Sequence, residues 1–309
     1  MSLESYVTGL MKEPSPKGMD RLVLSVLSQL EKMYFSQVEK KRTADMAAAV
    51  SAHVPVISVG NITAGGTGKT PCILMLAELF RSIGKKPAII SRGYKSGLEK
   101  EGGCVSDGRS ILVSQQMAGD EPYMMARKLP SVPIFIGKDR IASVKRAEKM
   151  GVGILLLDDG FQYWKLRRDQ DIILIDATNP FGYGHGLPRG LLREPLDALS
   201  QASLFILTKS DQVHLTDLME IREELARLAP GVPVLSSTHA PSKAVPYEKW
   251  KAFLHEGTLE DVQMKKAYLV SGIGNPAAFR KTAKEAGLRP VGEMPFPDHH
   301  RYTEEDLRN

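Results

Sequence analysis

Residues 60–70 read Gly60-Asn61-Ile62-Thr63-Ala64-Gly65-Gly66-Thr67-Gly68-Lys69-Thr70, and no other part of the chain constrains its architecture as strongly. This stretch follows the apolar run Val54–Val59 and precedes a helix-like run, Pro71–Ile83. A strand, a glycine-rich turn and a helix in that order form a cradle whose backbone N–H groups and helix dipole face phosphate oxygens. Lys69 is expected to reach the terminal phosphates, and the Thr70 hydroxyl to bind magnesium. We therefore predict a nucleoside triphosphate site formed by Thr63, Ala64, Gly65, Gly66, Thr67, Gly68, Lys69 and Thr70.

The loop departs from the usual phosphate-binding spacing at one position. A glycine is normal five residues before Gly68, where this chain has Thr63. Gly65 and Gly66 can take the positive-φ positions instead, so the cradle tolerates the change. The alternative is a glycine-rich turn without a ligand, but Gly-Lys-Thr lies at the expected helix start, where phosphate binding requires it.

Composition restricts the class of protein. The 309 residues carry a net charge of +5 with a pI near 9.0, which suits nucleotides, anionic lipid or nucleic acid without selecting among them. Two cysteines are too few for a disulfide framework, so a reducing, cytoplasmic setting is expected. No run approaches the roughly 18 apolar residues of a membrane-spanning helix, and the first residues do not predict a secretory signal.

An amphipathic helix is predicted near the N-terminus, capped by Asp20 and running to about Met46. Its apolar residues mostly follow steps of three and four and form one stripe, which Leu24 and Phe35 widen: Leu22, Val23, Val26, Leu27, Leu30, Met33, Tyr34 and Val38. The helix becomes basic at residues 40–42. Such a helix either lies in a lipid interface with its cations near headgroups or packs on its own domain. The pattern alone favours packing.

Apolar runs alternate with helical patterns from Val54 to about Ser237. The expected strands are Val54–Val59, Pro87–Ser91, Val132–Ile136, Ile154–Leu157, Asp171–Ile175, Ser203–Leu207 and Val232–Leu235. The expected helices are Lys69–Ile83, Glu121–Leu129, Arg140–Met150 and Thr216–Leu228. Continuous apolar strands are typical of a mostly parallel sheet with helices on both faces, so we predict an α/β fold of the P-loop NTPase type.

The remaining segments complete the predicted organisation. Gly97–Ser110 is expected to be a loop or small hairpin. A smaller C-terminal α/β lobe begins near Ala240, with strands at Ala267–Ser271 and Val291–Pro295 around a helix at Pro276–Ala286. The predicted division is 1–50 for the N-terminal helical segment, 51–239 for the P-loop core and 240–309 for the lobe.

Carboxylates stand at two positions where phosphate chemistry would need them. Asp158 ends the buried strand Ile154–Leu157, where P-loop proteins keep an acid associated with magnesium and where open α/β sheets bind ligands. The alternative is a surface turn formed by Asp158, Asp159 and Gly160. Asp120 and Glu121 open a predicted helix, where they either cap it or supply a base and a metal ligand.

Three further segments are candidates for function. Asp298 next to His299 can orient an imidazole for proton transfer, although a surface histidine pair explains the sequence equally well. The glycine-rich stretch Asn179–Pro195 carries Arg189 and Arg193, which could clamp phosphate. Thr208–Asp211 is similar to the base-reading segment of GTPases but lacks its asparagine.

Taken together, these motifs resemble the tetraacyldisaccharide 4′-kinase family of lipid A synthesis. The matching stretches run in family order across about residues 20–302: Val59–Ile62, Gly65–Pro71, Ser91–Tyr94, Gly119–Pro122, Gly137–Arg140, Asp158–Gln162, Asn179–Gly182, Leu192–Pro195, Ser271–Pro276 and Phe296–His300. The family also carries a non-glycine residue at the position of Thr63.

The resemblance implies a magnesium-dependent kinase that uses ATP to phosphorylate the 4′-hydroxyl of an acylated glucosamine disaccharide 1-phosphate. It implies that Asp120 is catalytic with His299 and Lys69. The implied metal ligands are Thr70, Glu121 and Asp158. The residues implied near the reacting phosphates or sugar are Arg140, Asp159, Gln162 and Arg193.

The resemblance also reverses the interpretation of the N-terminal helix. The family uses that region to sit on a membrane, so the implied partners are a lipid disaccharide and an anionic membrane surface, with no nucleic acid. The implied location is peripheral, at the cytoplasmic face of a bacterial inner membrane.

The chain departs from the family in two respects. Tyr163 replaces a usual histidine, and a tyrosine can donate a hydrogen bond but cannot carry a positive charge there. The chain also ends at Asn309, soon after His300, which suggests a truncated or naturally shortened C-terminus. Two other functions fit the motifs: a P-loop kinase of a soluble small molecule, and a membrane-docked GTP-dependent switch.

Overall fold

The computed structural model describes residues 3–11, 16–238, 240–252, 254, 256–274, 276–297, 300, 302–303 and 305–306. These fall into two compact units, Met1–Thr238 and His239–Asn309. Compactness does not test whether a segment folds independently, so the division into domains 1–50, 51–239 and 240–309 stays a prediction. Along the described residues, no helix has both the length and the apolar character needed to cross a bilayer.

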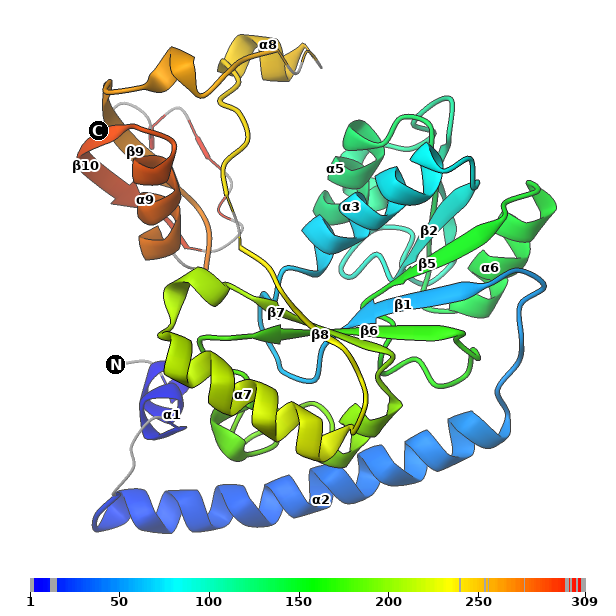
Figure 1. Cartoon of the computed structure of the whole chain (residues 1–309), viewed down its shortest axis with the longest axis vertical. Coiled ribbons are helices and arrows are strands. Elements are labelled where there is room, and N and C mark those ends of the chain that lie inside the picture. The colour runs from blue at the N-terminus through cyan, green and yellow to red at the C-terminus, as the bar shows by residue number, and fades with distance from the viewer. Residues whose placement is uncertain are drawn as a thin grey trace. The chain divides into compact units, whose positions relative to one another are not determined.

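The first unit is built on an eight-stranded sheet of order β3-β4-β2-β5-β1-β6-β7-β8 (Figure 1). All neighbouring strands are parallel except β3, which pairs with β4 in the antiparallel sense. The strands are β1 (Val56–Gly60), β2 (Pro87–Ser91), β3 (Gly103–Asp107), β4 (Pro133–Ile136), β5 (Ile154–Asp158), β6 (Gln170–Asp176), β7 (Leu204–Thr208) and β8 (Val234–Ser236). Strand β1 lies between β5 and β6, and the glycine-rich loop follows its carboxyl end. Open α/β sheets bind ligands beyond the carboxyl ends of their strands.

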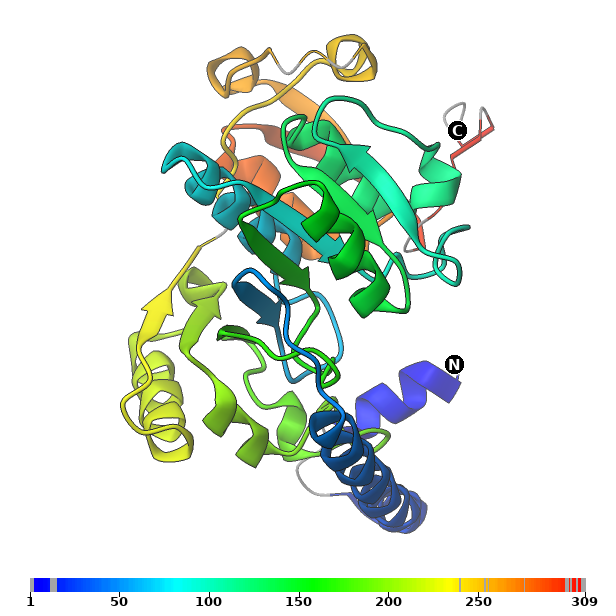
Figure 2. The same cartoon turned by 90° about the vertical axis from the view of Figure 1, so that its right-hand side faces the viewer.

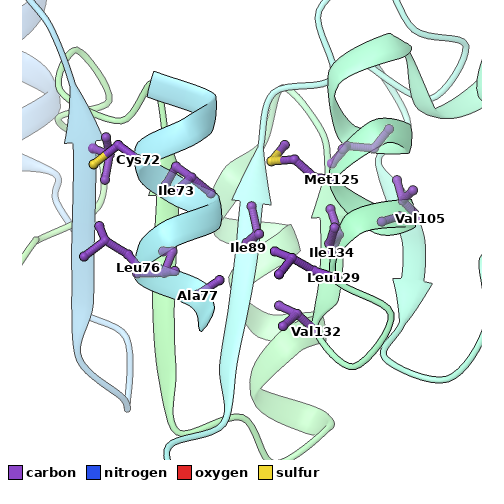
Figure 3. Packing of buried hydrophobic residues seen from close by; sticks show 14 of the residues in the cluster. Cys72, Ile73, Leu76, Ala77, Ile89, Val105, Met125, Leu129, Val132 and Ile134 are labelled. Carbon is purple, nitrogen blue, oxygen red and sulfur yellow. The ribbon is translucent and has the colours of Figure 1, made fainter. Parts of the chain in front are cut away.

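Helices cover both faces of this sheet, as the continuous apolar strands predicted (Figure 2). They are α3 (Lys69–Ser82), α4 (Gln115–Ala118), α5 (Asp120–Lys128), α6 (Arg140–Lys149) and α7 (Leu215–Leu228), with short 3₁₀ turns at Gly182–Gly184, Leu196–Gln201 and Ser210–Gln212. Successive residues of β5 point to opposite faces of the sheet and therefore pack in different cores. Leu156 packs with residues of α3 and α5 in one core, whereas Leu155 and Leu157 pack with residues of α6 in another. Figure 3 shows the first of these cores, with Ile73 of α3 and Met125 of α5 among its labelled side chains.

The N-terminus forms two helices, α1 (Leu3–Met11) and α2 (Met19–Ala47). The prediction that Asp20 caps the second helix is wrong. The helix begins at Met19, after Gly18 at a φ of 55°, and Asp20 instead accepts a hydrogen bond from the Tyr6 hydroxyl at 2.5 Å. The predicted apolar stripe also divides. Leu22, Val26, Leu30 and Met33 are exposed, together with Met19, whereas Leu24 is buried and Phe35 packs against the core between the sheet and α7.

The second unit contains a two-stranded parallel sheet. Strand β9 (Lys266–Ser271), helix α9 (Pro276–Glu285) and strand β10 (Arg289–Pro295) follow one another as a β-α-β unit. A short helix α8 (Tyr247–Lys251) and a 3₁₀ turn (Glu260–Val262) precede it. The predicted smaller α/β lobe is therefore present, and the predicted fold class is confirmed for the chain.

Candidate active site

The glycine-rich loop has the backbone that phosphate binding requires. It connects β1 to α3, and Gly68 lies directly before Lys69 at a φ of 85°. Gly65 also takes a positive φ of 119°, whereas Thr63 does not, so two glycines carry the strained positions. Gly66 is outside the left-handed region, contrary to the expectation. A glycine-rich loop that leads directly into a helix N-terminus is the arrangement that binds phosphate oxygens.

A distant segment holds this loop in place. Thr63 forms an antiparallel bridge with Leu192, and Ala64 N donates to the Leu191 carbonyl at 2.7 Å. Arg193 N donates to the Ile62 carbonyl at 2.6 Å. Residues 191–193, at the end of the glycine-rich stretch 179–195, therefore pair with the start of the phosphate cradle.

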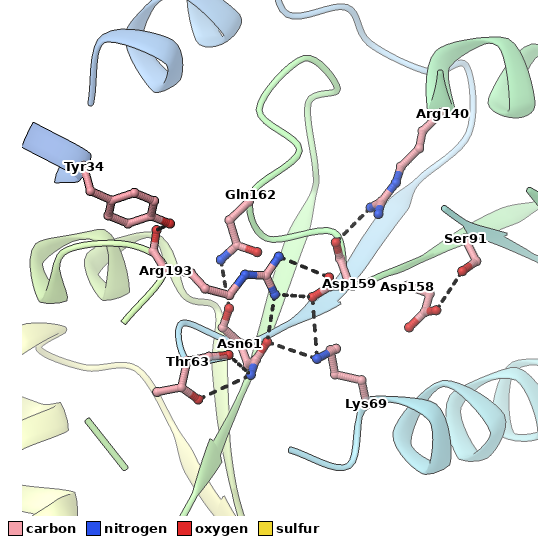
Figure 4. Close-up of polar contacts among 10 residues, drawn as sticks. All are labelled: Tyr34, Asn61, Thr63, Lys69, Ser91, Arg140, Asp158, Asp159, Gln162 and Arg193. Carbon is pink, nitrogen blue, oxygen red and sulfur yellow. Dashed lines mark hydrogen bonds and ion pairs between the residues drawn. The ribbon is translucent and has the colours of Figure 1, made fainter. Parts of the chain in front are cut away.

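Five polar side chains meet at the mouth of the cradle: Asn61, Lys69, Asp159, Gln162 and Arg193 (Figure 4). Lys69 Nζ donates to Asn61 Oδ1 at 3.1 Å and lies 3.6 Å from Asp159 Oδ1. The Arg193 guanidinium forms a bidentate pair with Asp159, with N–O distances of 2.8 and 3.2 Å, and its Nη1 lies 3.4 Å from Asn61 Oδ1. Gln162 Nε2 donates to the Asn61 carbonyl at 2.9 Å. The structure thus brings together Lys69, Asp159, Gln162 and Arg193, which the sequence had implied separately.

Asp159 is held ionised by its neighbours. Burial alone would raise its pKa, but hydrogen bonds and charge from Arg193, followed by the charges of Lys69 and Arg140, lower that pKa to about 2. Its backbone has a positive φ of 46°, so the carbonyl and the carboxylate serve different partners. The carbonyl accepts from Arg140 Nη1 at 2.9 Å. Arg140 is only 4% exposed, and this burial lowers its pKa.

Asp158 has the opposite electrostatic environment. Burial is the main cause that raises its pKa, to about 6; the hydrogen bond from Ser91 opposes this, and the charges of Asp159 and Glu121 add to it. Ser91 Oγ donates to Asp158 Oδ2 at 2.9 Å from the end of the adjacent strand. The charge of Arg140 lowers the pKa of Asp158, but burial and the two acidic charges outweigh it.

Asp120 is the exposed first residue of α5, where it accepts a hydrogen bond from Gln115 Nε2 at 2.9 Å. The N-cap is Gly119, at a φ of 85°, so the capping role considered for Asp120 is wrong. Glu121 follows on the same helix turn and is also exposed. His299, the predicted partner of Asp120, and Asp298 lie outside the described residues.

Tyr163 serves the protein framework in place of the expected histidine. Its hydroxyl accepts a hydrogen bond from Arg140 N at 3.1 Å, and its ring lies 5.2 Å from the Arg140 guanidinium carbon. Half-burial raises its pKa, so the hydroxyl stays protonated. Tyr163 thus fixes the start of α6, whose first residue, Arg140, contacts Asp159.

Asn61 and Ser91 are two site residues that sequence reasoning missed. Asn61 contacts three predicted residues, and Ser91 holds Asp158 in place. The available signal was position: Asn61 directly follows β1, and Ser91 ends the strand next to β5. Parallel strands that end side by side bring such residues together.

The cradle also contains polar atoms that can receive a ligand. Thr67 Oγ1 and Gln162 Oε1 are buried, and neither has a hydrogen-bond partner within the part of the chain that is described. In that same part, no group of three or more His, Cys, Asp or Glu side chains is suited to hold a metal ion.

Comparison with known proteins identifies the family of this chain. The tetraacyldisaccharide-1-P 4′-kinase family model matches residues 21–309. The chain belongs to this family. It is 38% identical to the tetraacyldisaccharide 4′-kinase of Halothermothrix orenii, with 99% of this chain and 82% of the relative aligned. It is 41% identical to the Desulfatibacillum aliphaticivorans enzyme of the same name, over 81% of this chain and 67% of that one.

A solved structure of the tetraacyldisaccharide 4′-kinase family has the same fold. The crystal structure of LpxK from Aquifex aeolicus in complex with ATP is 30% identical to this chain and superposes with a TM-score of 0.71. The match covers 91% of this chain and 84% of that one. The two chains therefore share their fold.

Proposed function

We propose that this protein transfers the γ-phosphate of ATP to the 4′-hydroxyl of tetraacyldisaccharide 1-phosphate. The convergence of Lys69 and Arg193 on Asp159, beyond the carboxyl ends of β1 and β5, is the observation that carries the proposal. Lys69 donates one hydrogen bond to Asn61 and stands 3.6 Å from Asp159, too far for a second strong one. Its ammonium therefore keeps donors for incoming phosphate oxygens.

Magnesium fits the acidic residues on the other side of the cradle. The raised pKa of Asp158 reflects a buried carboxyl beside two acidic charges, and a bound cation would favour its ionised form. We propose that Thr70, Glu121 and Asp158 hold the ion, with Ser91 orienting Asp158. When bound, Mg²⁺ would neutralise charge that develops on the transferring phosphoryl group.

The side chains then divide the remaining work. Lys69 and the loop N–H groups orient the β- and γ-phosphates, while Arg193 and Arg140 supply positive charge near Asp159. Asp120 is the proposed base for the sugar hydroxyl, because it is exposed at the start of α5 beside Glu121. Assistance from His299 remains part of the proposal. Most of the rate enhancement would come from positioning and electrostatic stabilisation.

The outer face of α2 is the proposed membrane contact. Met19, Leu22, Val26, Leu30 and Met33 are 44–71% exposed and follow one another by three or four positions. Contiguous exposed apolar side chains with nearby Lys and Arg are typical of interfacial helices. We propose that α2 places the protein peripherally on the cytoplasmic face of a bacterial inner membrane, where an acylated substrate resides.

The deciding experiment is transfer of labelled phosphate from γ-labelled ATP to purified tetraacyldisaccharide 1-phosphate in mixed micelles. Label is expected in the lipid product with the wild-type protein and is expected to be lost with Lys69→Ala. Absence of label in the lipid, with a folded protein that binds ATP, would refute the proposal. Excess unlabelled GTP should compete poorly, whereas strong GTP selectivity without lipid turnover would favour the membrane-docked switch.

A further inference from the structure

The inner face of α2 contacts residues 182–190 of the loop that leads to Arg193. Glu31 Oε1 accepts a hydrogen bond from Gly186 N at 2.6 Å, and Glu31 Oε2 lies 3.4 Å from His185 Nδ1. Arg189 Nη1 donates to Ser28 Oγ at 2.7 Å, one helical turn before Glu31. Two turns of α2 thus hold one side of the loop.

Tyr34 extends this contact to Arg193 itself (Figure 4). Its hydroxyl donates to the Arg193 carbonyl at 3.0 Å, and partial burial raises its pKa, which keeps the donor proton in place at ordinary pH. The side chain of that same Arg193 forms the bidentate pair with Asp159. One hydrogen bond therefore separates the helix from a residue at the mouth of the phosphate cradle.

The loop needs such support because of its composition. Gly182, Tyr183 and Gly184 all have positive φ, and few residues of the segment belong to regular structure. A glycine-rich chain loses much conformational entropy when it is fixed in one arrangement. Phe35 lies against Gly186 so closely that a Cβ built there would be 2.2 Å from its ring, so the helix also shapes the loop by packing.

We propose that α2 is a positioning element for the phosphate site as well as a membrane contact. This inference rests on the proposed kinase function. Glu31 and Tyr34 act as positioning residues that fix the 182–193 segment and, through it, the Arg193 guanidinium. Their side chains contact the loop, whereas the apolar stripe of the same helix is exposed, so the helix that meets lipid also determines where Arg193 stands.

Kinetics of two variants test the inference. Tyr34→Phe removes only the hydroxyl, and Glu31→Ala removes the acceptor of Gly186 N. Each is expected to lower kcat by about 3- to 10-fold, the loss of one hydrogen bond in positioning, without weakening sedimentation with anionic vesicles. Glu31→Gln, which keeps an acceptor oxygen, should restore most of the rate. Ser25→Ala, which removes an exposed hydroxyl from the same helix, is the matched control and should change neither quantity.

A double-mutant cycle distinguishes positioning from a general loss of structure. In an Arg193→Ala background, Tyr34→Phe is expected to have almost no further effect on kcat, because the residue that it positions is gone. Full additivity of the two losses would overturn the inference. It would also be overturned if Ser25→Ala lowered the rate as much as Tyr34→Phe.

Hydrogen exchange supplies a measurement that needs no turnover. The Gly186 and Arg193 amides are expected to exchange roughly 10-fold faster in Glu31→Ala than in the wild type, with β5 amides unchanged. If the variant shows this faster exchange but the wild type does not phosphorylate the disaccharide, the proposed function is refuted and the positioning role of α2 is supported. An active wild type whose variants show unchanged exchange and unchanged kcat would overturn the inference alone.

Discussion

Asp158 and Asp159 are neighbours in the chain, yet folding moves the pKa values of their carboxyl groups in opposite directions. Burial raises the pKa of Asp158 to about 6, whereas Arg193, Lys69 and Arg140 lower that of Asp159 to about 2. The two residues face different partners because Asp159 takes a positive φ of 46°, which turns its side chain away from the strand direction. The Asp158 carboxyl is thus buried with a raised pKa, whereas the Asp159 carboxylate pairs with both Arg193 and Lys69.

The cost of keeping Asp158 ionised can be measured through Asp158→Asn. Its pKa rises on folding from 3.8 to about 6, so the native state retains a proton that the unfolded state has lost, and stability falls as the pH rises between these values. At pH 7 the variant is expected to gain about 2–3 kcal/mol in free energy of unfolding without nucleotide, and almost nothing below pH 4. Urea unfolding at both pH values checks this.

Asp159→Asn is the matched control for that measurement. The pKa of Asp159 is lowered on folding, so its stabilising contribution is present above the unfolded value and is lost as the pH falls toward about 2. This variant is therefore expected to be less stable than the wild type at pH 7. An Asp158→Asn protein that also unfolds at lower urea would contradict the electrostatic account of both residues.

Asp120→Asn tests the proposed base. The amide keeps the size of the side chain but cannot accept the sugar proton, so kcat should fall by about 10²- to 10⁴-fold. The affinity for ATP, measured with a fluorescent analogue, should stay within about 3-fold because the P-loop is untouched. Gln115→Ala, which removes a hydrogen-bond donor to Asp120, should cost only a few-fold. Turnover that survives Asp120→Asn unchanged would remove Asp120 from this role.

The sequence could predict site residues whose placement depends on neighbours in the chain. Lys69 and Thr70 follow from the order strand, glycine-rich turn and helix, and Asp158 follows from its position at the end of an apolar strand. The position of Asn61 directly after β1 was a signal, but its contact with Arg193 could not be predicted, because the two residues are 132 positions apart. The framework role of Tyr163 depends on Arg140 in the same way.

Helix α2 has two functional faces along one length. The outer stripe is exposed, and the inner side chains contact the loop beside the phosphate cradle. The sequence predicted an amphipathic helix but grouped Tyr34 with Leu22 on one stripe. The periodicity of the sequence predicts that a helix has an apolar side. It cannot predict which of these residues are buried, because that depends on which loop packs against the helix.

Val26→Asp and Leu30→Asp test the outer stripe. These side chains are 55% and 44% exposed, so their replacement should leave thermal stability nearly unchanged. Sedimentation with anionic vesicles should weaken about 10-fold or more for each, because an apolar group leaves the interface and a like charge enters it. Ser25→Asp makes the same charge change about a quarter turn away and should cost much less. Equal losses for all three variants would assign the effect to charge alone.

Most strands were predictable because they are continuous apolar runs. Strand β5 was expected at Ile154–Leu157 and extends one residue further, to Asp158. Strand β3 was not predicted as part of the sheet, because Gly103–Asp107 has few apolar residues and lies at an antiparallel edge. An edge strand buries only part of its surface, so its sequence carries a weaker signal.

At the scale of the whole molecule, the excess of basic residues gives the protein a net charge of +5. Attraction to anionic lipid should add to the apolar contact of α2 and should be screened by salt, since the Debye length falls from about 10 Å at 0.1 M to about 3 Å at 1 M. Raising salt over that range is expected to reduce binding to anionic vesicles severalfold and to leave binding to neutral vesicles nearly constant. Salt-independent binding to anionic vesicles would contradict an electrostatic contribution.

The bridge between Thr63 and Leu192 has a consequence for biosynthesis. The first half of the phosphate cradle is translated about 130 residues before the segment that braces it. A nascent chain therefore cannot complete its nucleotide site until residue 193 has left the ribosome, although the glycine-rich loop emerges much earlier. Binding of ATP to the nascent polypeptide would then show that residue 193 has left the ribosome.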